Sequence, residues 1–264
     1  MSEWPSGTVS ISGGHLAYHR TGGNGQSLVL SHGLTDNGLC WSRVAALLAP
    51  DFDVIMLDAR GHGQSSRIPL DAPHEPSQDL AEVIDQLTLI SPIVMGHSVG
   101  ARATATYANS HPSRVSRVIL EDPPFLPLPN PAATSVRRDR FRAQVEKFQA
   151  MSEAEIMAMG KATSPLWHAD EFPAWTTAKK QVDPQAMPHY ATAWQDSIAQ
   201  ITAPTLLIRG QSGGGGIINE EIAAEAQAIN PNIRTVEIKA AGHNIRRENF
   251  EGYMAAVRAF LAVD

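Results

Sequence analysis

The chain has 264 residues, 43% of them hydrophobic and 18% charged, which is long enough for one sizeable folded domain. Its net charge of −6, from 27 acids against 21 bases, argues against general nucleic-acid binding, which needs a basic surface. The single cysteine, Cys40, excludes an internal disulfide, and no apolar run approaches the ~20 residues that span a bilayer. We therefore expect a cytoplasmic protein, a monomer or homodimer, with no membrane or nucleic-acid partner.

Predicted strands and helices alternate along the first 124 residues. Apolar and polar residues alternate around Gly13-Gly14, which predicts an opening β-hairpin. Short apolar runs predict buried strands in QSLVLS, DFDVIMLD, SPIVMG and SRVSRVILED. Segments with helical periodicity lie between them: LCWSRVAALLAP, SQDLAEVIDQLTL and SVGARATATYANSHP. This alternation is typical of a parallel sheet with helices on both faces.

The pattern changes at residue 125. From 125 to 198, helix-like stretches bearing Met and Trp follow one another without an obvious strand. The alternation then resumes in APTLLIRG, NEEIAAEAQAI, IRTVEIKAAGH and RRENFEGYMAAVRAFLA. We predict an α/β core from residues 1–124 and 199–264, with a helical cap, 125–198, inserted over one end of the sheet. In open α/β sheets that end is where ligands bind.

A candidate nucleophile lies in the segment MGHSVGA. Gly96 to Gly100 fit the pattern G-x-S-x-G, with a buried strand before it and a small-residue helix after it. At this tight corner the two glycines remove Cβ atoms that would clash. We therefore predict Ser98 to be a nucleophile on a strand-to-helix turn. The side chain of His97, in the variable position, is expected to pack or hydrogen-bond locally.

A serine nucleophile needs a base and an oxyanion site with two N–H donors. His243 follows the last predicted strand in KAAGHNIRR, which places it at the same sheet edge as Ser98. The predicted amide donors are Val99, next to the nucleophile, and Leu34 in the loop SHGLTD. These residues predict a hydrolytic site at the carboxyl edge of the sheet.

Five motifs, in this order and spacing, resemble the α/β-hydrolase family over nearly the whole chain: SHGLTDNG, LDARGHGQS, MGHSVGA, LLIRG and AAGHNI. The resemblance implies an eight-stranded, mostly parallel sheet with helices on both faces and a helical cap inserted after the sixth strand. It also implies Ser98 as nucleophile, His243 as base, and the amides of Leu34 and Val99 as the oxyanion hole.

The acid of the triad departs from the usual family pattern. The family usually carries it after the seventh strand, but LLIRGQSGGGGIINEE has no carboxylate before Glu220. Some members carry it after the sixth strand, where Glu121 and Asp122 precede two prolines. Because side chains alternate along a strand, the two acids point to opposite sides. We predict Asp122, nearer the strand end, with Glu121 and then Glu220 as alternatives.

The predicted chemistry is acyl transfer to water through an acyl-enzyme intermediate. The expected substrate is an ester, thioester or lactone of small to medium size and largely apolar character. No metal or cofactor is expected, because the sequence contains neither metal-ligand spacing nor a phosphate-binding glycine loop ending in GK[ST]. Two alternatives remain: a C–C bond hydrolase of a diketone acid on the same triad, and a catalytically slow ligand-binding protein of this fold.

Further candidates concern the substrate pocket. Five aromatic residues are candidate pocket residues, with packing of the cap as the alternative for most of them: Trp41, Phe125, Trp167, Trp175 and Trp194. Arg246 and Arg247 follow the catalytic loop and could hold a substrate carboxylate, but at a helix start they are expected to be solvated. Cys40 is expected to be structural.

Overall fold

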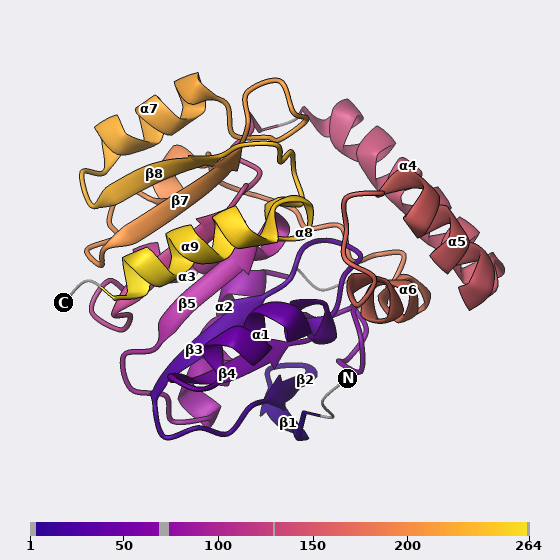
Figure 1. Cartoon of the computed structure of the whole chain (residues 1–264), viewed down its shortest axis with the longest axis horizontal. Coiled ribbons are helices and arrows are strands. Elements are labelled where there is room, and N and C mark those ends of the chain that lie inside the picture. The colour runs from indigo at the N-terminus through magenta and orange to yellow at the C-terminus, as the bar shows by residue number, and fades with distance from the viewer. Residues whose placement is uncertain (1–3, 69–73, 129, 263–264) are drawn as a thin grey trace.

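One mixed sheet forms the centre of the computed structural model, which describes residues 4–68, 74–128 and 130–262. The strand order is β1-β2-β4-β3-β5-β6-β7-β8 (Figure 1). The strands are β1 Ser6–Ile11, β2 Gly14–Arg20, β3 Gln26–Ser31, β4 Phe52–Leu57, β5 Ile93–His97, β6 Arg117–Glu121, β7 Thr205–Gly210 and β8 Ile233–Ile238. β2 pairs antiparallel with β1 and β4, and the other neighbours pair in parallel. The predicted eight-stranded, mostly parallel sheet is confirmed.

Helices cover both faces of this sheet. On one face, α2 (Pro76–Gln86), α3 (Val99–Ser110) and α7 (Glu220–Ile229) share an apolar cluster with the strands. On the other face, α1 (Ser42–Leu48) and α9 (Phe250–Leu261) pack in the same way; both lie in front of the sheet in Figure 1. Because strands buried on both faces need apolar side chains at every position, their sequences read as continuous apolar runs rather than as alternating patterns.

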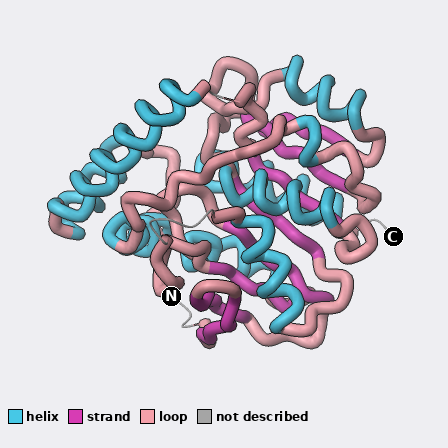
Figure 2. Tube along the Cα trace, turned by 180° about the vertical axis from the view of Figure 1, so that it is seen from behind, coloured by secondary structure: helices cyan, strands magenta, loops and turns pink. Residues whose placement is uncertain are grey.

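The segment between β6 and β7 forms a helical layer beside the sheet. It contains α4 (Pro131–Ala150), α5 (Glu153–Thr163), α6 (Glu171–Lys180) and the short 3₁₀ helix η2 (Gln195–Ser197). Both views place α4, α5 and α6 to one side of the strands (Figures 1 and 2). We call residues 125–198 the cap. Residues 1–3 and 263–264, at the ends of the predicted core, lie outside the described residues.

The two ends of the cap meet where it leaves and rejoins the core. The rings of Phe125 and Trp194 stack with centroids 4.7 Å apart and an interplanar angle of 10°. Both side chains are buried in the apolar cluster that also contains α3 and β6. The insertion therefore starts and finishes at one point of the core. In the described ranges, none of the helices is both long enough and apolar enough to cross a bilayer.

Candidate active site

Ser98 lies on the sharp turn between β5 and α3. Its backbone has φ 53° and ψ −122°, a conformation that non-glycine residues rarely adopt and that costs about 1–3 kcal/mol. The surrounding chain leaves no room for side chains: a Cβ on Gly96 would lie 2.5 Å from the Gly100 carbonyl carbon, and one on Gly100 would lie 2.4 Å from the His32 carbonyl oxygen. The turn presents Ser98 at the start of α3, with its side chain facing a cavity.

His243 and Asp122 form a short hydrogen bond beside this turn. Nδ1 of His243 lies 2.6 Å from Oδ2 of Asp122, and His243 lines the same cavity as Ser98. The Asp122 carboxylate is fully buried, whereas the His243 side chain is 32% exposed. Because the carboxylate only accepts, Nδ1 carries the proton and Nε2 is left as an acceptor. This is the arrangement that a general base needs.

The loop after β7 stabilises the Asp122 carboxylate. Its oxygens accept hydrogen bonds from the amides of Ile217 (2.8 Å) and Ile218 (2.9 Å). The glycines before them allow close packing on the base loop, since a Cβ on Gly242 would lie 2.1 Å from the Gly214 carbonyl oxygen. The segment that lacks an acid in the sequence therefore supplies amide donors to the acid on β6. Sequence reasoning missed Ile217 and Ile218, although the missing carboxylate and the glycine run were visible signals.

The two alternative acids lie elsewhere. Glu121 is buried but points away from His243: it accepts from the backbone amide of Arg246 (2.9 Å) and from its guanidinium (3.1 Å). Glu220 is exposed in the first turn of α7, a position where the helix dipole favours an acid. Of the three predicted acids, Asp122 is the one that the structure brings to His243.

The expected oxyanion donors lie close to the nucleophile. A Cβ on Gly33, next to Leu34, would lie 3.5 Å from the Cβ of Ser98. Among the described residues, the N–H groups of Leu34 and Val99 have no hydrogen-bond partner. Both residues line the cavity. Two unpartnered amides beside a serine can stabilise the charge of a tetrahedral intermediate.

His97 contacts a distant segment rather than a local one. Its Nε2 donates to the backbone carbonyl of His243 (3.0 Å), 146 residues away in the sequence. His97 is buried, as the packing alternative predicts, but its hydrogen bond is not local, because His97 joins the nucleophile turn to the base loop. Burial, together with the charges of Arg246 and His243, holds the pKa of His97 well below its usual value, so the ring stays neutral.

A cavity of about 570 Å³ lies between the core and the cap. Its floor contains Ser98 and His243, and its cap wall contains Phe148, Trp167 and Trp175. The two tryptophan rings meet edge to face with centroids 5.8 Å apart. Trp167 and Trp175 are therefore placed at the cavity, as candidate pocket residues.

Three other candidate pocket residues are packed in the interior. Trp41 is fully buried among side chains of α1, α9 and the strands, under the guanidinium of Arg246 (4.2 Å). Phe125 and Trp194 stack on each other in the opposite cluster. Trp41 and Phe125 are 0% exposed and Trp194 is 4% exposed. The prediction that these three residues line the pocket is therefore wrong, because each ring fills a site in the core.

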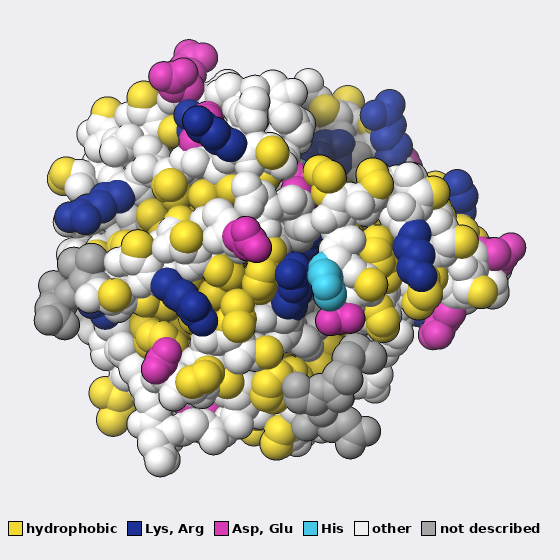
Figure 3. All heavy atoms as spheres, viewed as in Figure 1, with side chains coloured by type: hydrophobic (Ala, Val, Ile, Leu, Met, Phe, Trp, Pro, Cys, Tyr) yellow, Lys and Arg dark blue, Asp and Glu magenta, His cyan; other side chains and the backbone are white. Residues whose placement is uncertain are grey.

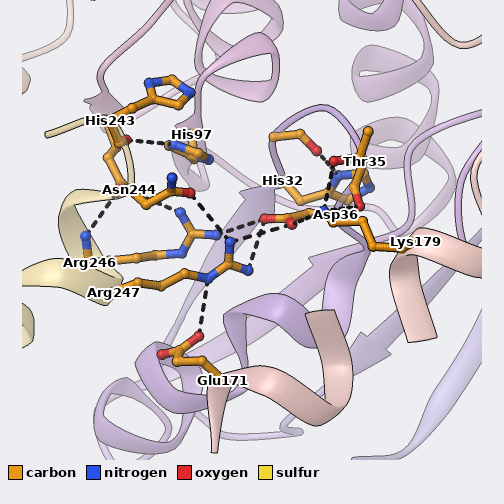
Figure 4. A network of polar contacts seen from close by, with 12 residues as sticks. His32, Thr35, Asp36, His97, Glu171, Lys179, His243, Asn244, Arg246 and Arg247 are labelled. Atoms are coloured by element: carbon orange, nitrogen blue, oxygen red, sulfur yellow. Dashed lines mark hydrogen bonds and ion pairs between the residues drawn. The ribbon is translucent and has the colours of Figure 1, made fainter. Parts of the chain in front are cut away.

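Arg246 and Arg247 belong to a buried ion network that sequence reasoning missed (Figure 4). Both follow the base loop, in α8 (Ile245–Glu248), and both are at most 2% exposed. Arg246 contacts Asp36 (3.1 Å) and Glu121 (3.1 Å). Arg247 contacts Asp36 (3.0 Å) and Glu171 of the cap (3.3 Å). The expectation of solvated arginines is wrong, because acids from distant segments pair with them.

Lys179 of the cap completes this network. Its Nζ lies 3.5 Å from Oδ1 of Asp36 and donates to the carbonyl oxygen and hydroxyl of Thr35. Burial alone would raise the pKa of Asp36, but Arg247, Lys179 and Arg246 outweigh it and hold that pKa far below its usual range. Asp36 is therefore a carboxylate throughout the working pH range, and it joins the base loop, the cap and the loop after β3.

Cys40 is buried beside the cap cluster of Phe148 and Trp175. Burial, with a contribution from nearby Asp36, raises the pKa of its thiol to about 12. A thiol with so high a pKa is almost entirely protonated near neutral pH and is a poor nucleophile. The structural role expected for Cys40 agrees with this placement.

Comparison with known proteins identifies the family. The model of the alpha/beta hydrolase fold matches residues 26–249. N-formylmaleamate deformylase from Pseudomonas putida is 29% identical, over 97% of this chain and 96% of that protein. 2-(Acetamidomethylene)succinate hydrolase from Mesorhizobium japonicum is 24% identical, over 92% and 90%. The crystal structure of an E-2-(acetamidomethylene)succinate hydrolase superposes with a TM-score of 0.83, at 23% identity, over 99% of this chain and all of that one. The family predicted from the motifs is confirmed: this chain belongs to the α/β-hydrolases.

Proposed function

We propose that the protein is a serine hydrolase that removes a short acyl group, linked through nitrogen or oxygen, from a small anionic substrate. The observation that carries this proposal is the His243–Asp122 hydrogen bond of 2.6 Å in the wall of the cavity that also holds Ser98. In the proposed mechanism, Ser98 Oγ attacks the acyl carbon while His243 Nε2 takes its proton.

The remaining steps use the same groups. The tetrahedral oxyanion accepts hydrogen bonds from the amides of Leu34 and Val99. Collapse expels the leaving group, which His243 protonates, and leaves the acyl group on Ser98 as an ester. His243 then deprotonates a water molecule that attacks this ester and releases the acid. Asp122, held by the Ile217 and Ile218 amides, orients the imidazole and stabilises its protonated form.

The anionic character of the proposed substrate rests on the charges around the cavity. Arg137 and Arg138 of α4 line it and are exposed, and within the described residues neither makes an ion pair. An unpaired guanidinium is well suited to a carboxylate, which it binds through two parallel hydrogen bonds. The names of the two relatives both describe an acid carrying an N-acyl group, a formyl group in one and an acetamido group in the other. This supports a carboxylate substrate over the largely apolar one expected from the sequence.

The size and surface of the protein support a small-molecule substrate. A volume of about 570 Å³ suits a compact molecule. On the face shown in Figure 3, basic, acidic and apolar side chains are intermixed, and such a surface does not favour a polyanionic partner. C–C bond hydrolysis of a diketone acid is the second candidate, because the same triad and the same arginines suit that substrate.

The test is hydrolysis of a matched substrate panel by wild type and by Ser98→Ala. The panel comprises an N-formyl and an N-acetyl amide of a small unsaturated dicarboxylate, a diketone acid, and neutral p-nitrophenyl acetate. We expect turnover of an N-acyl acid, a burst of p-nitrophenol from the ester, and the loss of both in Ser98→Ala. Turnover of the diketone acid alone favours the second candidate. Binding without turnover contradicts the proposal and identifies a ligand-binding protein.

A further inference from the structure

The oxyanion loop is a tight turn whose third residue is in an unfavourable conformation. The amide of Asp36 donates to the carbonyl of Gly33 (3.1 Å), which closes a four-residue turn with Leu34 second and Thr35 third. Thr35 has φ 67°. Turns with a left-handed third residue normally place glycine or asparagine there, because a β-branched side chain crowds its own backbone. Neighbouring contacts must therefore hold this turn, which sets the direction of the Leu34 amide.

Core residues hold the first and last positions of the turn. His32 Nδ1 donates to the carbonyl of Gly33 (2.8 Å), and its Nε2 accepts from the amide of Ala59 (3.0 Å). Arg246 and Arg247 fix the carboxylate of Asp36. These contacts come from the loops that follow β3 and β4 and from α8. They leave the third position, Thr35, to be held from another direction.

A cap residue holds that third position. Lys179, in the last turn of α6, donates from Nζ to the Thr35 carbonyl (2.8 Å) and to the Thr35 hydroxyl (2.7 Å), across 144 residues of sequence. Its side chain is 5% exposed and lies over the ring of Trp175, with Nζ 4.7 Å from the centroid. Two hydrogen bonds to one residue fix both the peptide plane and the side chain of Thr35 (Figure 4).

Given the proposed function, we infer that Lys179 is a positioning residue for the oxyanion hole, through which docking of the cap fixes the Leu34 amide. Lys179 acts on the reaction through Thr35 and the turn. Without it, the turn relaxes from the left-handed conformation and the Leu34 N–H moves away from the oxyanion. The cap then contributes to catalysis itself as well as to substrate choice.

The chain offers a matched control in the next residue. Lys180 also donates from Nζ to two backbone carbonyls, those of Gln149 (2.5 Å) and Met151 (2.6 Å), but both lie within the cap. Lys179→Met and Lys180→Met therefore each remove two Nζ hydrogen bonds and one positive charge from neighbouring positions, and Lys179→Met also removes the ion pair with Asp36 and the contact with the Trp175 ring. Only the first substitution touches the oxyanion turn. Lys179→Arg restores a cation with several N–H donors.

The experiment compares these variants on neutral p-nitrophenyl acetate, so that attraction of an anionic substrate plays no part. We expect Lys179→Met to lower kcat about 100-fold with little change in KM, since a 1 Å misplacement has an effect of this order and complete loss of an oxyanion donor has an effect of about 10²- to 10³-fold. Affinity for a boronic acid, whose adduct with Ser98 places an oxygen in the oxyanion hole, should fall by the same factor. Affinity for the carboxylate product should not change. Lys180→Met should match wild type, and Lys179→Arg should recover most of kcat.

Other outcomes overturn the inference. If Lys179 had a purely structural role, Lys179→Met would lower thermal stability and raise KM. The ratio of boronic acid affinity to product affinity would then stay at the wild-type value. If Lys179→Met does not fold, Thr35→Val removes one acceptor and leaves the lysine in place. It should lower kcat several-fold with KM unchanged, and an unchanged kcat contradicts the inference. Failure of the proposed function is recognised separately, because the wild type would then either show no turnover or keep its turnover in Ser98→Ala.

Discussion

The core and the cap are held by different forces. In the core, strand side chains such as Leu28, Val94 and Ile119 are fully covered, and helices pack on both faces of a hydrogen-bonded sheet. Among the described residues, most apolar side chains of the cap lie in two small clusters, which also take in Cys40, Leu34 and Ile68 of the core. Beyond these clusters and the Phe125–Trp194 stack, the cap meets the core through the buried pairs Glu171–Arg247 and Lys179–Asp36. Apolar packing is non-directional, whereas ion pairs and hydrogen bonds fix individual atoms.

This difference suggests a division of labour. The sheet determines where the strands end, and hence where the proposed nucleophile, base and acid are placed. The cap contacts determine the fine orientation of the oxyanion loop and the charge at the cavity mouth. Substitutions in the core triad should therefore affect the chemical step for every substrate. Substitutions at the cap mouth should depend on the charge of the substrate.

The largest effect is expected from Asp122→Asn. The single oxygen of the introduced amide would accept from the Ile217 and Ile218 N–H groups, so its NH2 would donate to Nδ1 of His243; this holds the imidazole in the wrong tautomer, and kcat should fall by about 10⁴-fold. Steady-state kinetics with both neutral and anionic substrates measure this. Glu220→Gln, at the exposed start of α7, is the control and should resemble wild type. A near-normal Asp122→Asn enzyme would show that the acid lies elsewhere.

A smaller, substrate-dependent effect is expected at the cap mouth. In the double variant Arg137→Gln with Arg138→Gln, KM for a carboxylate substrate should rise about tenfold, the equivalent of roughly 1.4 kcal/mol, with kcat unchanged. The KM for p-nitrophenyl acetate should stay constant. Arg140→Gln with Arg142→Gln removes the same charge from other exposed positions of α4 and serves as control. An equal rise in KM for both substrates would contradict selective recognition of the anion.

The core should also determine how stability depends on pH. Burial lowers the pKa of His32, His62 and His97, that of His62 to about 3. The unfolded chain therefore binds protons near pH 6.5 that the folded state does not bind. The contribution of these neutral histidines to the free energy of unfolding is fully present above that pH. It is lost as the pH falls toward their pKa values in the folded state. His62→Asn should reduce the slope of unfolding free energy between pH 6 and 4 by up to about 1.4 kcal/mol per pH unit, measured by urea titration. An unchanged slope would show that His62 is protonated in the folded state.

The smallest effect is expected where the core and cap meet at Cys40. Because burial raises the pKa of this thiol to about 12, the folded enzyme at pH 8 should not react with iodoacetamide over hours. The urea-unfolded chain should react at the rate of an ordinary thiol. Mass spectrometry of the alkylated peptide measures both rates. Rapid labelling of the folded enzyme would show that the cap opens over Cys40.

Much of the fold could be predicted from local sequence patterns. Short apolar runs identify the parallel strands, and G-x-S-x-G between a strand and a helix identifies the Ser98 turn. The placement of His243 and Asp122 could be predicted because both follow strands that end at one edge of the sheet. Each of these conclusions depends on residues that are close in sequence or on a rule about strand ends.

The ion network, the burial of the aromatic rings and the contact between cap and oxyanion loop could not be predicted, because they depend on residues far apart in the sequence. Arg246 looks like a solvated helix residue until Asp36, 210 residues away, is brought beside it. Trp41 and Trp194 are of a residue type that is common in pockets, but the side chains that pack around each ring decide whether it lies in the core or in a pocket. The bond from Lys179 to Thr35 joins the cap to a loop 144 residues earlier. Polar contacts between distant segments leave no periodicity and no motif.

The stack of Phe125 on Trp194 has a consequence for how such proteins diversify. Because Phe125 and Trp194 hold the two ends of the cap together, the cap leaves and rejoins the core at one point, however many residues it contains. Loop-closure entropy grows only slowly with length, by about 0.6 kcal/mol per doubling, so the sheet tolerates helices being added or exchanged beyond this stack. The segment between these two aromatic residues is therefore a natural unit to exchange, because it would combine this catalytic core with a different substrate-binding cap.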